Sequence, residues 1–232
     1  MTYSTKISAP NDEGEFAIYV AEPATEPKAA IVVIQEIFGV NAGIRRKCDL
    51  LAQAGYLAVA PDMFWRMEPG LQLDPDTSSS GDRAVALVIR FDTDAGVRDI
   101  QAVIDKARAI VGGKKVGLVG YCLGGRMAAF AAARTDVDAS VGYYGVQIEK
   151  MLLEKDGIAK PLMLHIPDVD PHVSAEVQAE IHKAFDDHPR VTLYDYPGEH
   201  HGFADTFGER RSEQAARDAD ARTMAFFAEH LA

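Results

Sequence analysis

The stretch that most restricts the fold is residues 116–133, where a buried strand turns abruptly into a helix. A short apolar run from Val116 predicts the strand, and the alanine-rich run that follows predicts the helix. Between them, Gly120-x-Cys122-x-Gly124 has the G-x-S-x-G spacing of a nucleophile elbow, with cysteine in place of serine. The reversal crowds the backbone, so side chains two residues either side must be almost absent. The alternative is a plain glycine turn around a buried cysteine.

Length and charge limit the classes of protein to consider. The 232 residues suit one α/β domain over 1–232. A net charge of −11 disfavours nucleic acid or an anionic membrane as partner. No apolar run approaches about 18 residues and no signal peptide is visible, so we expect neither a membrane span nor export. Two cysteines are too few for a disulfide framework, which favours a reducing, cytoplasmic location.

The rest of the chain alternates apolar strands with amphipathic helices after an N-terminal hairpin. Strands are predicted over 3–9, 15–21, 30–35, 56–60, 116–119, 138–144, 161–166 and 190–196. Helices are predicted over 41–54, 82–90, 93–110, 123–133, 147–155, 174–187 and 209–230, with Asn41, Thr93 and Ser174 as caps. This order indicates an α/β fold with a mostly parallel sheet and helices on both faces. The long loop over 61–82 carries aromatic side chains and is either a structural flap or a wall of a pocket.

Four polar residues each follow a predicted strand, and all can meet at one edge of the sheet. They are Glu36, Cys122, Asp170 and His201. Ligands of open α/β sheets bind at the carboxyl ends of the strands. The order Cys122, Asp170, His201 is the nucleophile, acid and base order of α/β-hydrolases. The sequence therefore predicts nucleophilic hydrolysis at this edge.

The predicted roles follow from the chemistry of the side chains. Cys122 at a helix N-terminus favours the thiolate, His201 exchanges the proton, and Asp170 orients the imidazole. The backbone N–H groups of Leu123 and Ile37 are candidates for an oxyanion hole.

Alternatives exist for several of these positions. His200 could act as base in place of His201, and Asp168 could replace Asp170. Asp168, Asp170, His172 and His200 could instead bind a metal, although their alternating loop spacing argues only weakly for it; we expect no metal and no cofactor. Glu36 could be a solvated carboxylate at the end of a strand, or could lie beside Cys122 and govern its protonation. His165 and Cys48 are expected in the core.

With these residues identified, the chain resembles the dienelactone hydrolase (carboxymethylenebutenolidase) family over nearly its whole length. The matching stretches are 35–41 (Q-E-I-F-G-V-N), 55–62, 116–125 and 141–146. The resemblance implies an α/β-hydrolase fold, a Cys122–His201–Asp170 triad, activation of the thiol by Glu36, and an oxyanion hole at Ile37 and Leu123. It also implies a lactone-opening reaction through an acyl-thioester, with no cofactor.

Two positions depart from the family pattern. Asp205 and Gly81 stand where the family has arginines that bind the substrate carboxylate, although Arg83 is close by. We therefore expect an ester or lactone substrate other than the carboxylated dienelactone. The alternatives are an esterase or thioesterase of neutral acyl groups, or a non-catalytic binding protein.

Candidate pocket residues are Phe38, Phe64, Trp65, Arg83, Tyr144, Phe203 and Asp205. We expect a monomer or weak homodimer.

Overall fold

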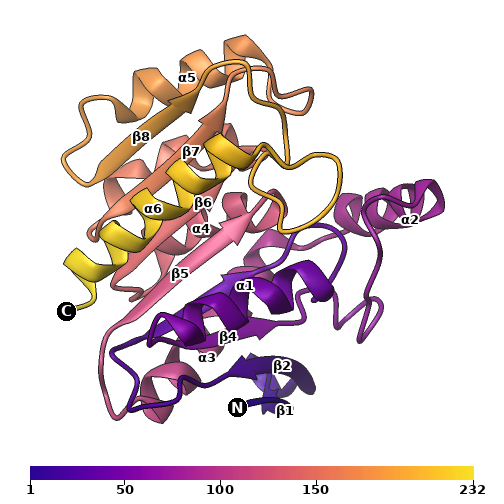
Figure 1. Cartoon of the computed structure of the whole chain (residues 1–232), viewed down its shortest axis with the longest axis vertical. Coiled ribbons are helices and arrows are strands. Elements are labelled where there is room, and N and C mark those ends of the chain that lie inside the picture. Colours follow the sequence, from indigo (N-terminus) through magenta and orange to yellow (C-terminus); the bar gives the residue numbers. More distant parts are fainter.

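An eight-stranded sheet runs through the molecule in the order β1-β2-β4-β3-β5-β6-β7-β8 (Figure 1). The computed structural model describes the backbone of residues 1–232 and every side chain except that of Ser78. The strands are β1 (Thr2–Ser8), β2 (Glu15–Ala21), β3 (Ala30–Ile34), β4 (Leu57–Pro61), β5 (Val116–Tyr121), β6 (Ala139–Tyr143), β7 (Leu162–Pro167) and β8 (Val191–Tyr196). β1 and β2 pair antiparallel, β2 pairs antiparallel with β4, and every other pair is parallel. The predicted mostly parallel sheet is confirmed.

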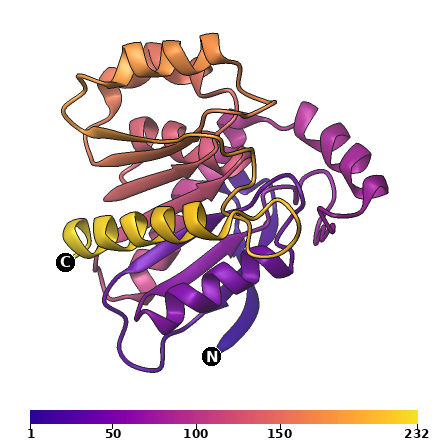
Figure 2. The same cartoon turned by 45° about the horizontal axis from the view of Figure 1, so that its top comes forward.

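Helices cover both faces of this sheet, as predicted (Figures 1 and 2). On one face lie α1 (Ala42–Gln53) and α6 (Glu213–His230), whose apolar side chains share one core cluster. On the other lie α3 (Thr93–Ile110), α4 (Leu123–Arg134) and α5 (Ala175–Phe185), which pack into a second cluster. Two 3-10 helices, η1 (Pro10–Asp12) and η2 (Ile148–Gly157), complete the set, and α2 (Ser78–Ile89) stands out from the body in both views.

The helix caps follow local side-chain chemistry, with one correction. Asn41 and Ser174 accept hydrogen bonds from backbone N–H groups three residues on, as predicted. Thr93 is not a cap: the Asp92 carboxylate accepts from the Ala95 N–H at 3.0 Å and starts α3 one residue earlier. Carboxylates and threonine hydroxyls compete for this position, and the carboxylate also benefits from the helix dipole.

Two other helix boundaries were predicted wrongly. α2 begins at residue 78, four residues before the predicted start, because the serine run there accepts helical geometry. α6 begins at Glu213 and not at 209, because the backbone at Ser212 is extended (φ −102°, ψ 108°) and makes this residue the N-cap.

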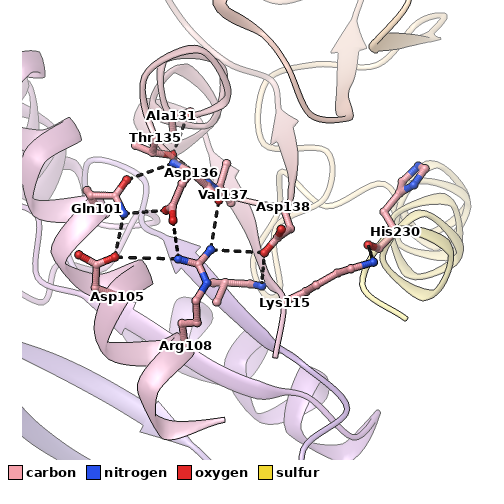
Figure 3. A network of polar contacts seen from close by, with 11 residues as sticks. Gln101, Asp105, Arg108, Lys115, Ala131, Thr135, Asp136, Val137, Asp138 and His230 are labelled. Atoms are coloured by element: carbon pink, nitrogen blue, oxygen red, sulfur yellow. Dashed lines mark hydrogen bonds and ion pairs between the residues drawn. The ribbon is translucent and has the colours of Figure 1, made fainter. Parts of the chain in front are cut away.

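At the amino ends of β5 and β6, a polar network fastens α3 to the sheet (Figure 3). Arg108 donates to the Asp136 carboxylate at 2.7 Å and to that of Asp138 at 3.4 Å. Asp138 in turn accepts from the Val116 N–H at 2.9 Å, where β5 begins. The network therefore holds the strand of the elbow from the end opposite to Cys122.

The long loop before α2 is a structural flap in its aromatic part. Trp65 stacks on Phe16 at 5.5 Å between ring centroids and donates its indole N–H to the Asp99 carboxylate at 2.9 Å. Phe64 is fully buried and packs edge-on against Phe91. Both were predicted to line a pocket, and this prediction is wrong: their large apolar rings are used to close the core over α3.

We expect Asp99→Ala to lower the free energy of unfolding by about 2–3 kcal/mol, because buried Asp99 pairs with both Trp65 and Arg66. Urea unfolding measures the change. Asp105→Ala, on the exposed side of the same helix, is the matched control and should change stability by less than about 0.5 kcal/mol. Equal stability of the two variants would contradict the anchoring role.

Candidate active site

Cys122 lies at the tip of a strained turn between β5 and α4. Its φ of 55° and ψ of −111° lie outside the regions that a non-glycine residue ordinarily adopts. Its neighbours have no room for side chains: a Cβ on Gly120 would collide with the Gly124 carbonyl, and one on Gly124 with the Ile34 carbonyl. The nucleophile-elbow geometry predicted from the glycine spacing is present.

The base and acid side chains meet beside this turn. His201 Nδ1 lies 2.7 Å from Asp170 Oδ2, and the charge of the Cys122 sulfur acts on the same imidazole. Cys122, Asp170 and His201 are each 7 % exposed, so water scarcely competes for these contacts.

The two alternative residues lie elsewhere. His200 is exposed and its ring contacts the Val169 carbonyl at 3.0 Å. Asp168 is exposed and accepts from the Gly198 N–H at 2.6 Å, which shapes the loop between β8 and His201. Within the described residues neither side chain forms a hydrogen bond with Cys122 or His201, so the geometry favours His201 and Asp170.

The protonation of His201 depends on its neighbours. Burial alone would lower its pKa, but the negative charge of the Cys122 sulfur and the hydrogen bond to Asp170 raise the pKa to about 10. A raised pKa means that the imidazolium persists as the pH rises, until about pH 10. The arrangement therefore favours a protonated His201 at neutral pH.

Removing the sulfur should reverse this shift. In Cys122→Ala we expect the pKa of His201 to fall by more than one unit, because the main charge that opposes its desolvation is gone. NMR titration of the imidazole in both proteins measures the change. His182→Ala, which removes a partly exposed histidine away from the site, assigns the resonances without altering His201. An unchanged pKa would show that Cys122 carries no negative charge beside His201.

The predicted oxyanion donors are free to act. Leu123 is the first residue of α4, so its N–H has no acceptor within the helix. The N–H of Ile37, in the loop after β3, has no acceptor among the described residues. The β3–β5 register pairs Ile34 with Gly120 and brings this loop next to the elbow.

Glu36 has a partner that the sequence did not reveal. Its Oε2 accepts from Arg210 Nη2 at 3.4 Å, and the same Nη2 lies 2.5 Å from Asp205 Oδ2. Arg210 therefore serves two buried carboxylates. Neither spacing nor periodicity indicates this residue, which comes from the irregular loop before α6. The only usable signal was the need of buried Glu36 for a cation.

Asp205 lies inside this cluster and, together with Glu36, lines a cavity of about 240 Å³. It accepts from the Tyr144 hydroxyl at 3.1 Å. Burial, followed by the charge of Glu36, raises the pKa of Asp205 to about 7 against the opposing effect of Arg210. The carboxyl is thus only partly charged at neutral pH, and repels an anion less than its sequence position suggested.

Two more neighbours of the triad were missed. The His172 ring lies 4.7 Å from that of His201, edge-on. Arg126, one turn beyond the nucleophile, is buried; its Nη1 lies 2.5 Å from Gln147 Oε1, and its Nε and Nη2 have no partner among the residues described. Its positive charge interacts with Cys122 and favours a thiolate there.

The remaining candidate pocket residues lie in different surroundings. Tyr144 packs 5.0 Å from the His201 ring, and Phe38 lies under Arg210, at 5.6 Å from its guanidinium carbon. Phe203 is fully buried against Tyr196, so it supports the His201 loop from the core. Arg83 pairs with Glu68, and its place in the pocket stays a prediction.

The other titratable candidates belong to the core. His165 is buried, and its two ring nitrogens contact Tyr196 at 2.7 Å and Thr223 at 3.0 Å. Burial and the charge of Arg222 lower the pKa of His165 to about 3, so it stays neutral. Cys48 is buried on α1, and burial raises the pKa of its thiol. Within the described residues, no group of three or more His, Cys, Asp or Glu side chains could bind a metal ion.

An α/β sheet with a nucleophile elbow and a buried Cys–His–Asp constellation defines the class of α/β-hydrolases. Every helix in the described part of the chain falls short of what crossing a bilayer requires.

Comparison with known proteins narrows the class. The dienelactone hydrolase family profile matches residues 16–231. A carboxymethylenebutenolidase of Pseudomonas putida is 39 % identical, and the match covers 94 % of this chain and 92 % of the relative. Carboxymethylenebutenolidase 1 of Cupriavidus pinatubonensis is 37 % identical over 93 % of this chain and 92 % of its own.

A solved structure agrees at the level of the fold. The crystal structure of a dienelactone hydrolase-like promiscuous phosphotriesterase from metagenomic libraries superposes with a TM-score of 0.81 at 21 % identity, covering 100 % of this chain and 99 % of that one. The chain belongs to the dienelactone hydrolase family. It is a hydrolase of ester or lactone bonds, acting on a small-molecule substrate.

Proposed function

We propose that the chain opens its ester or lactone substrate through Cys122 as the nucleophile. The observation that carries this proposal is the buried contact of His201 with Asp170 near the strained turn that presents Cys122. The sulfur attacks the carbonyl carbon, a C–S bond forms, and the oxyanion accepts hydrogen bonds from the Leu123 and Ile37 N–H groups. The C–O bond then breaks, and His201 gives its proton to the leaving oxygen.

Water completes the reaction. His201, now neutral, accepts a proton from the water that attacks the acyl-thioester, the C–S bond breaks, and the acid product leaves. Asp170 orients the imidazole throughout. Glu36, held by Arg210 in the resting site, is the carboxylate next to the oxyanion loop and is released when substrate displaces this ion pair.

We further propose that the substrate differs from the carboxylated dienelactone. Gly81 carries no cation, Arg83 is paired with Glu68, and Arg210 already serves Glu36 and Asp205. An incoming carboxylate on this side thus meets two acidic groups, Glu36 and Asp205, and Arg210 is already paired with both. A neutral acyl group avoids that repulsion.

A panel of lactones and p-nitrophenyl esters, with and without a carboxylate, tests both proposals. We expect turnover by the wild type, a preference for neutral substrates of at least tenfold in kcat/KM, and loss of turnover in Cys122→Ala. Cys48→Ala is the matched control and should keep its activity. Full activity of Cys122→Ala would refute the nucleophile, and a preference for carboxylated substrates would refute the substrate class.

We also propose the kind of partner, the cellular location and the assembly of the chain. The net charge of −11 supports a small molecule as partner in place of nucleic acid. Two free thiols, one of them in the site, support a reducing cytoplasmic location. A monomer or weak homodimer and one domain over 1–232 remain our proposal for the assembly.

A further inference from the structure

A cavity lies between α1 and α6, against β5 and β6. Its volume is about 480 Å³, which is within the range of small-molecule sites. Apolar side chains from both helices and the sheet form most of the wall: Leu50, Leu51, Val119, Tyr121, Phe207 and Met224. Cys122 does not line it, so this cavity is distinct from the space above the nucleophile.

The charges of the cavity have the opposite sign to those of the molecule. Three cations line it, Arg46, Lys47 and Arg211, against one carboxylate, Asp220. The whole chain has a net charge of −11. Arg211 pairs with Glu213, but within the described residues neither Arg46 nor Lys47 has a carboxylate oxygen within 4 Å.

Lys47 lies at the inner part of this cavity. Its ammonium donates to the Ala204 carbonyl at 2.8 Å and lies 4.0 Å above the Tyr121 ring. Burial lowers the pKa of Lys47 against the charges of Asp220, Asp205 and Glu36, which raise it. An anion in direct contact with the ammonium would offset part of its desolvation.

A second cavity of about 240 Å³ adjoins the first. The two share Lys47, Tyr121, Thr206 and Phe207, and the second is also lined by Glu36 and Asp205. Charge placed near Lys47 is therefore close to the carboxylates that Arg210 holds. Lys47 already interacts electrostatically with both of them.

We propose that the cavity between α1 and α6 binds a small monocarboxylate with an apolar body, its carboxylate on Lys47 and Arg46 and its apolar part against Leu50, Leu51 and Met224. This site is separate from the catalytic one and does not depend on the proposed reaction. The acid released by hydrolysis of an ester has the same chemistry, so a product can occupy it.

Calorimetric titration with octanoate tests the site. We expect one saturable site in the wild type and equal affinity in Cys122→Ala, because the nucleophile does not line the cavity. Lys47→Met keeps the aliphatic stem and removes the charge, so octanoate should bind at least tenfold more weakly. Ala54→Phe places a ring in the cavity and should abolish binding by filling it. Neutral 1-octanol should bind at least tenfold more weakly than octanoate.

Controls separate this proposal from folding and from catalysis. Lys160→Met removes an exposed lysine elsewhere and should bind as the wild type does. Thermal unfolding shows whether each variant is folded. If Lys47→Met does not fold, Ala54→Phe still tests the site. Equal affinity in the wild type, Lys47→Met and Ala54→Phe would overturn the proposal. So would loss of binding in Cys122→Ala, which would place octanoate in the catalytic site. None of these results depends on whether esters are turned over.

Discussion

Cys122→Ser is expected to keep the fold and lose about 10³-fold or more in kcat/KM for ester hydrolysis. The structure explains the size of this loss. A serine hydroxyl stays neutral at pH 7, so it supplies no negative charge beside His201 and forms no ion pair with it. The hydroxyl is also a weaker nucleophile than a thiol, so its proton must be removed in the transition state. Steady-state kinetics with one p-nitrophenyl ester and a thermal unfolding curve measure the two effects.

Cys48→Ser is the matched control, which distinguishes an effect of the position in the site from a general effect of replacing sulfur with oxygen. Both substitutions change sulfur to oxygen in a buried residue, but Cys48 lies on α1, away from His201. We expect Cys48→Ser to lower stability by about 1–2 kcal/mol and to leave kcat/KM within about twofold. Activity of Cys122→Ser equal to that of the wild type would show that the thiol–imidazole pair makes no special contribution.

Gly124→Ala is expected to cost at least about 4 kcal/mol of unfolding free energy, or to prevent folding. The added Cβ would collide with backbone oxygens of the loop after β3, which cannot rotate away as a side chain could. Expression in soluble form and urea unfolding measure the result.

Gly81→Ala provides the matched control, because Gly81 is inside α2 and an added Cβ there meets nothing within 4 Å. This variant should be as stable as the wild type or more stable by up to about 1 kcal/mol. A folded Gly124→Ala of normal stability would mean that the elbow relaxes more easily than its contacts imply.

Local chemistry predicted most of the fold and the centre of the site. The apolar strands and the stripe of α1 follow periodicity, and the elbow follows glycine spacing, so each is encoded within a few residues of itself. The convergence of Asp170 and His201 on Cys122 follows from their places after parallel strands.

The sequence did not predict the contacts that loops make, or those between segments far apart in the chain. Arg210 reaches Glu36 from 174 residues away through an irregular segment, and no periodic pattern records such a contact. Trp65 was assigned to a pocket because aromatic residues in long loops often line one, but its indole N–H donates a hydrogen bond to Asp99 on α3. In both cases the tertiary partner, not the residue type, determines the role.

The burial of Cys122, His201 and Asp170 determines how the proposed reaction depends on ionic strength. Cys122, His201 and Asp170 are each 7 % exposed, and mobile ions cannot come between charges that solvent scarcely reaches. Added salt should therefore leave the internal proton transfer almost unaffected. Arg46 and Phe207, at the mouth of the cavity between α1 and α6, are exposed to those same ions. One small protein thus holds a salt-insensitive reaction centre beside a cationic opening whose attraction for anions weakens as salt is added.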